Sequence, residues 1–89
     1  MQGLIVRHNI SAAFMPEHWG LTGDAAETEV ATEMLNEALE EAVNSEGSNA
    51  SFVYESMASV QSQLGDVEID NETATALVEQ VVNTVFGQS

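Results

Sequence analysis

Carboxylates are the most abundant reactive groups in this chain, because fifteen Asp and Glu residues stand against one Arg and no Lys. Those of segment 66–71 alternate with apolar residues ahead of a predicted helix, a pattern found in calcium-binding loops. Such a loop needs a bidentate carboxylate at its twelfth position, which here is Leu77. We therefore interpret Val67 and Ile69 as anchors of a loop above the core, and Asp70 as a helix cap.

Other catalytic or metal-binding patterns are equally incomplete. His8, Glu17 and His18 are too few and too irregularly spaced for a zinc site, which needs three or four convergent ligands. The chain has no Cys, and its six Gly form no phosphate-binding loop. We therefore predict no metal, no cofactor and no enzymatic activity.

The net charge of −14 is the main guide to function. A chain this acidic repels nucleic acid and anionic lipid, and it attracts cations or basic protein surfaces. Two interpretations stay open. The acidity keeps a small protein soluble or adapts it to high salt, or it forms a surface that recognises a partner.

Recognition would use the carboxylates of one predicted helix, which lie mostly opposite its apolar face. These are Glu27, Glu29, Glu33, Glu37, Glu40 and Glu41. We expect them to dock on a protein with a basic surface, for example a nucleic-acid-binding protein that this chain inhibits by imitating phosphate charge. Direct binding to nucleic acid or membrane is not expected.

An apolar group near the N-terminus offers a second kind of contact. Phe14, Met15 and Trp19 are of types favoured at interface centres, and they are candidate anchors for a partner. The alternative is that Phe14 and Trp19 close one end of the helical core.

Hydrophobic periodicity predicts a small, mainly α domain of three helices in residues 24–89. The first helix carries two apolar lines, Val30-Met34-Ala38-Ala42 and Ala31-Leu35-Leu39-Val43. The second repeats Val53, Met57, Val60 and Leu64, with Phe52 beside them. The third, from about Asn71 to Phe86, carries a stripe of Ala74, Leu77, Val78, Val81, Val82, Val85 and Phe86. Short connections favour antiparallel neighbours.

Residues 1–23 form an irregular or short-stranded N-terminal arm of the same single domain. Gly3–Val6 is apolar enough for a strand, while Pro16 and Gly20 interrupt any long helix. The start of the chain lacks the apolar region of a signal peptide, so we expect a cytoplasmic location.

Segment 5–12, Ile-Val-Arg-His-Asn-Ile-Ser-Ala, with Gly-Leu-Thr at 20–22, resembles the N-terminal start of bacterial flagellins. The resemblance implies an arm that becomes ordered during assembly of an extracellular filament. It covers about a fifth of the chain. The Pro at position 16 and the absence of Arg after Arg7 depart from the flagellin pattern.

A structural role is therefore the alternative function. In it the N-terminal arm and the last helix pack against neighbouring copies in a homo-oligomer or filament, and the location would be extracellular.

Overall fold

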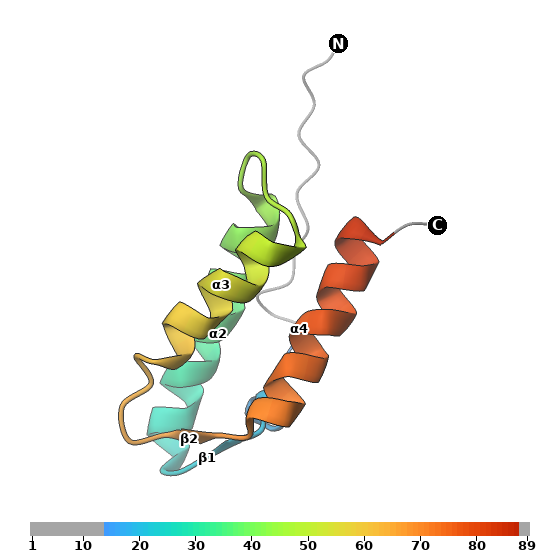
Figure 1. The fold of residues 1–89 in the computed structure, drawn as a ribbon. Helices are drawn as coiled ribbons and strands as arrows, with labels where there is room; N and C mark the ends of the chain where they lie inside the picture. The colour runs from blue at the N-terminus through green and yellow to red at the C-terminus, as the bar shows by residue number, and fades with distance from the viewer. Residues whose placement is uncertain (1–13, 88–89) are drawn as a thin grey trace.

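Helices make up most of the described part of the chain, residues 14–87 of a computed structural model (Figure 1). The elements are α1 (Pro16–Trp19), β1 (Leu21–Thr22), α2 (Ala25–Asn44), α3 (Ala50–Gln61), β2 (Glu68–Ile69) and α4 (Asn71–Phe86). This confirms the predicted mainly α domain with a short-stranded arm. The predicted strand at residues 3–6 lies outside the described residues.

Side-chain caps begin two of the three long helices. Asp24 Oδ2 accepts a hydrogen bond from the Ala26 N–H at 3.1 Å, and Asn49 Oδ1 accepts one from the Phe52 N–H at 2.9 Å. Each bond satisfies a backbone donor that the helix itself leaves unpaired. At α4, Asp70 occupies the cap position, where its carboxylate accepts a bond from the Thr73 hydroxyl.

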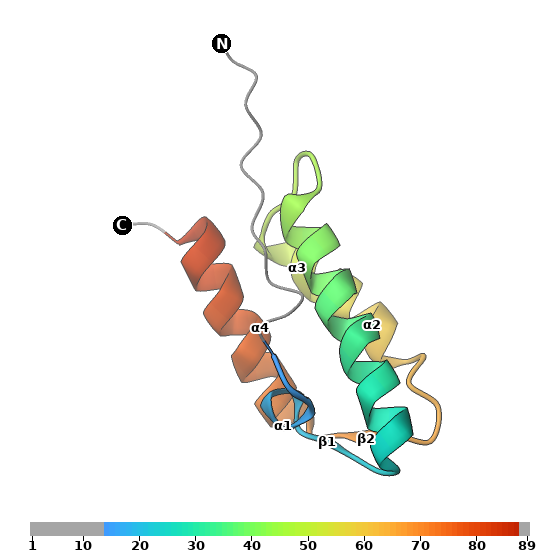
Figure 2. The same cartoon turned by 180° about the vertical axis from the view of Figure 1, so that it is seen from behind.

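The long helices run up, down and up along the molecule (Figure 1). α2 and α3 lie side by side as an antiparallel pair, and α4 packs against both. β1 and β2 pair antiparallel across the lower end, with Leu21 opposite Ile69 and Thr22 opposite Glu68. α1 lies beside the start of α4 (Figure 2), so the described part of the predicted arm belongs to the domain.

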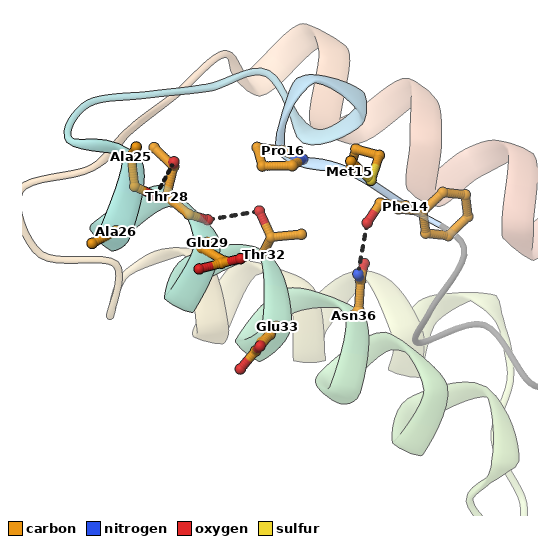
Figure 3. Close-up of a pocket in the computed structure, with 10 residues that line it drawn as sticks. All are labelled: Phe14, Met15, Pro16, Ala25, Ala26, Thr28, Glu29, Thr32, Glu33 and Asn36. Carbon is orange, nitrogen blue, oxygen red and sulfur yellow. Dashed lines mark hydrogen bonds between the residues drawn. The ribbon is translucent and has the colours of Figure 1, made fainter.

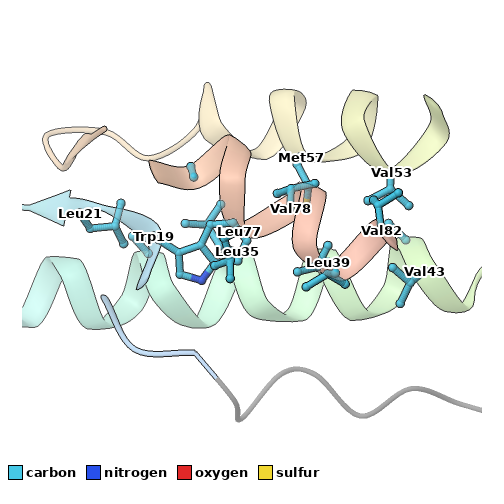
Figure 4. Packing of buried hydrophobic residues seen from close by; sticks show 14 of the residues in the cluster. Trp19, Leu21, Leu35, Leu39, Val43, Val53, Met57, Leu77, Val78 and Val82 are labelled. Atoms are coloured by element: carbon cyan, nitrogen blue, oxygen red, sulfur yellow. The ribbon is translucent and has the colours of Figure 1, made fainter. Parts of the chain in front are cut away.

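The hydrophobic core fills the space between α2, α3 and α4 and extends to Trp19 and Leu21 (Figure 4). Trp19 is fully buried, as are Leu35 and Leu39 of α2. The predicted stripe of α4 is confirmed: five of its seven residues are buried, and Val85 and Phe86 pack half-buried against them.

The predicted apolar lines of α2 divide between core and surface. Ala31, Leu35 and Leu39 face the core, whereas Val30 is 58% exposed and Met34 is half-buried. α3 also ends at Gln61, before the predicted Leu64. The core therefore takes one line of α2 and the last member of the other, Ala42, and leaves Val30, Met34 and Ala38 at least partly accessible.

A buried hydrogen-bond chain joins the N-terminal segment to α2. The Trp19 indole N–H donates to Asn36 Oδ1 at 2.8 Å, and Asn36 Nδ2 donates to the Phe14 carbonyl at 3.0 Å. Because each polar group has a partner, the buried Asn36 side chain avoids the cost of an unpaired amide.

Candidate partner-binding surface

The six carboxylates predicted to bind a partner all lie on α2 and point away from the core. Glu27, Glu29, Glu33, Glu37 and Glu41 are exposed, and Glu40 is half-buried. We call these six residues the α2 acidic row. With 100° between successive residues, the row covers an arc of roughly 160° on the helix. Thus one face of α2 is buried in the core, and the acidic row spans most of the remaining circumference of the helix.

The charge density of this row approaches that of one nucleic-acid strand. From the first member to the last the helix rises about 21 Å, so one carboxylate occurs about every 4 Å. A single strand of B-DNA carries one phosphate per about 3.4 Å. The spacing along the axis is therefore comparable, although the carboxylates are spread around the helix.

No Lys or Arg occurs within residues 14–87, so the row has no strong cation within the described part of the chain. Glu29, Glu33, Glu37 and Glu41 follow one another at intervals of four, where each like-charged pair costs an isolated helix about 0.2–0.5 kcal/mol. Glu41 also lies in the last turn of α2, where the helix dipole disfavours negative charge. Helix stability therefore does not explain this arrangement.

The three predicted apolar anchors are placed differently from one another. Trp19 is fully buried against α2 and its indole N–H is hydrogen-bonded, so it belongs to the core. Phe14 is half-buried and packs edge-on against Trp19, with ring centroids 6.1 Å apart. This matches the alternative in which both rings close the end of the core. Met15, 55% exposed, remains accessible to a partner.

A hollow of about 520 Å³ lies between residues 14–16 and the first half of α2 (Figure 3). Its polar lining includes Thr28, Thr32 and Asn36, with Glu29 and Glu33 of the acidic row. The two hydroxyls donate to backbone carbonyls of α2, at 2.9 and 2.7 Å. The lining includes no His, Lys or Cys.

A second feature, which the sequence did not predict, is a pair of hollows along the outer side of α2 and α3. One hollow of about 510 Å³ is lined by Val30, Met34 and Leu64, among others. A second, of about 330 Å³, is lined by four residues of the end of α2 and its C-cap and by four of α3: Ala38, Glu41, Ala42, Ser45, Phe52, Ser56, Ser59 and Val60. The sequence carries a signal for this feature in Val30, Met34 and Ala38, which belong to one of the two predicted apolar lines of α2.

Among residues 14–87, no group of three or more His, Asp or Glu side chains is arranged to hold a metal ion. His8, one of the three residues considered for a zinc site, lies outside these residues. None of the helices in the same range has the length and apolar character needed to cross a membrane.

No family model matches this chain, and no curated protein or solved structure matches it. The resemblance of residues 5–22 to flagellins therefore has no support from these comparisons, and residues 5–13 lie outside the described part. Within that part, the helix of the arm stops at Trp19, and Gly20 in a left-handed conformation follows it.

Proposed function

We propose that this protein is a non-catalytic interaction module whose α2 acidic row docks on a basic surface of another protein. The observation that carries the proposal is the placement of six carboxylates on the solvent side of one helix, within a stretch that contains no Lys or Arg. Such a row gives a directional field that steers a basic partner toward α2.

In its sharper form, the partner is a nucleic-acid-binding protein and the row occupies its phosphate-binding groove. The axial charge spacing of about 4 Å, close to that of one DNA strand, supports this form. The mechanism is competition: carboxylates take the positions of phosphates, and the nucleic acid is displaced.

A displacement assay tests the proposal. A linker histone is bound to a fluorescent DNA duplex, and the protein is added while anisotropy is followed. The wild type should release the duplex. A variant with Glu29→Gln, Glu33→Gln and Glu37→Gln should need about tenfold more protein, which corresponds to about 1.4 kcal/mol.

The control removes the same charge elsewhere, through Glu46→Gln, Glu55→Gln and Glu79→Gln, all at exposed positions. It should behave like the wild type to within about threefold, or about 0.7 kcal/mol. Equal losses in the two variants would show that only net charge matters. Failure of the wild type to displace DNA at any salt concentration would refute the proposal.

A further inference from the structure

Two hollows follow one another along the outer side of α2 and α3. The lining of the first is mainly apolar, and the lining of the second combines apolar side chains with Ser45, Ser56 and Ser59. Val30 and Met34 of α2 face Leu64, and farther along the same side Ala38 faces Phe52 and Val60. Val30 is 58% exposed and Phe52 is 42% exposed. Both values are high for large apolar side chains that lie next to a neighbouring element. We call the two hollows together the α2–α3 groove.

Three carboxylates line this groove, and two of them belong to the α2 acidic row. Glu27 and Asp66 flank the hollow beside Val30, and Glu41 lines the hollow beside Phe52. An occupant must therefore present both apolar side chains and positive charge to the groove. A second copy of this chain fits poorly, since its net charge of −14 would bring like charges together.

The shape of the groove points to a helix as the occupant. Val30, Met34 and Ala38 recur every four residues, so they form a row about 12 Å long that turns by about 80° around α2. An amphipathic helix can pack against such a row with its side chains at positions i, i+3 or i+4, and i+7. It would occupy the open side of the α2–α3 pair, while α4 packs against that pair elsewhere.

We propose that the α2–α3 groove binds a helical segment of the partner that carries an apolar stripe flanked by Lys and Arg. This inference rests on the proposed function, because it names the part of the basic partner that makes contact. The acidic row steers the segment, and the groove selects it by its apolar stripe.

The probes are two peptides of about 18 residues, enough for about five helical turns. Both contain the same Leu and Lys residues. In one the leucines follow helical spacing along one face, and in the other they are scrambled. Titration calorimetry with the full chain should give at least tenfold tighter binding of the striped peptide.

Protein variants locate the site. Val30→Ser combined with Phe52→Ser should weaken striped-peptide binding about tenfold and leave scrambled-peptide binding unchanged. Tyr54→Ser is the matched control, because this exposed aromatic residue lies on the α4 side of α3. It should change neither affinity. Melting curves of all variants verify that each remains folded.

The outcomes separate the two proposals. Equal binding of both peptides overturns the groove and leaves the acidic row as the binding surface, whereas no binding of either overturns both. A self-association that the double Ser variant abolishes would make a second copy the occupant. Tight striped-peptide binding that appears only after deletion of residues 1–13 would make that segment the occupant. Either result overturns this inference.

Discussion

Asn36 shows how a single polar residue can be required inside an apolar interface. Its amide accepts from the Trp19 indole and donates to the Phe14 carbonyl, so it connects the N-terminal segment to α2. Replacement by Ala removes both partners and leaves the buried indole N–H without an acceptor. A buried unpaired donor costs about 1–3 kcal/mol.

We therefore expect Asn36→Ala to lower the free energy of unfolding by about 2–3 kcal/mol in urea denaturation. Asn83→Ala, at an exposed position of α4, should change it by less than about 0.5 kcal/mol. In a double-mutant cycle, Trp19→Phe should cost less in the Asn36→Leu background than in the wild type. Additive costs would contradict a direct role for this bond.

The sequence predicted little of this residue-level detail. Thr28, Thr32 and Asn36 recur every four residues on the side of α2 that faces the core, and all three are buried. Polar residues at such spacing normally indicate a solvent-facing side. Here the hydroxyls bond to carbonyls of their own helix, and the amide meets an indole from a segment 17 residues earlier. The spacing of residues along one helix does not predict a hydrogen bond to a partner so distant in the sequence.

At the scale of elements, Gly20 holds together the end of the domain where α1, the sheet and α4 meet. Its φ is +72°, and its carbonyl accepts from the Asp70 N–H at 2.8 Å. A Cβ here would lie 2.8 Å from Asp70 Cβ and 3.0 Å from Thr73 Cβ. Both the backbone conformation and the contact with α4 therefore require glycine.

Gly47 provides a matched comparison, because its φ is +76° and a Cβ there would meet nothing within 4 Å. We expect Gly47→Ala to cost about 1 kcal/mol, from conformation alone. Gly20→Ala should cost about 2–4 kcal/mol, since the contact adds to the conformation. Chemical denaturation measures both values, and equal costs would show that the contact with α4 is unimportant.

The existence of the long helices followed from apolar periodicity and capping residues, but the choice of core face on α2 did not. Two adjacent apolar lines made that face broader than one packing partner can cover. The line through Leu35 and Leu39 is buried because α3, α4 and Trp19 form the core with it. Of the other line, Ala42 is buried as well, whereas Val30 is exposed and Met34 and Ala38 are half-buried beside the groove. That choice depends on tertiary packing, as does the pairing of β1 with β2.

At the scale of the whole molecule, the three long helices of the described part run along one another (Figure 1). Much of its helical surface is therefore accessible, which suits a module that acts through a surface. The same shape also suits the alternative of a subunit assembled with other copies. Charge distinguishes the two, because salt weakens binding to a basic partner and reduces repulsion between identical acidic copies.

If the acidity is an adaptation to high salt, the expected dependence of folding on salt differs from that of the recognition proposal. If the carboxylates serve recognition, the core and hydrogen bonds must hold the fold together despite their mutual repulsion. If they serve adaptation, the repulsion must be screened before the chain can fold.

The most direct measurement is circular dichroism combined with light scattering after size exclusion, at about 0.01 M and about 1 M salt. The Debye length falls from about 30 Å to about 3 Å between these conditions. We predict a folded, helical monomer at both concentrations. A chain that folds only near 1 M salt would contradict the account, and a folded oligomer at low salt would favour assembly.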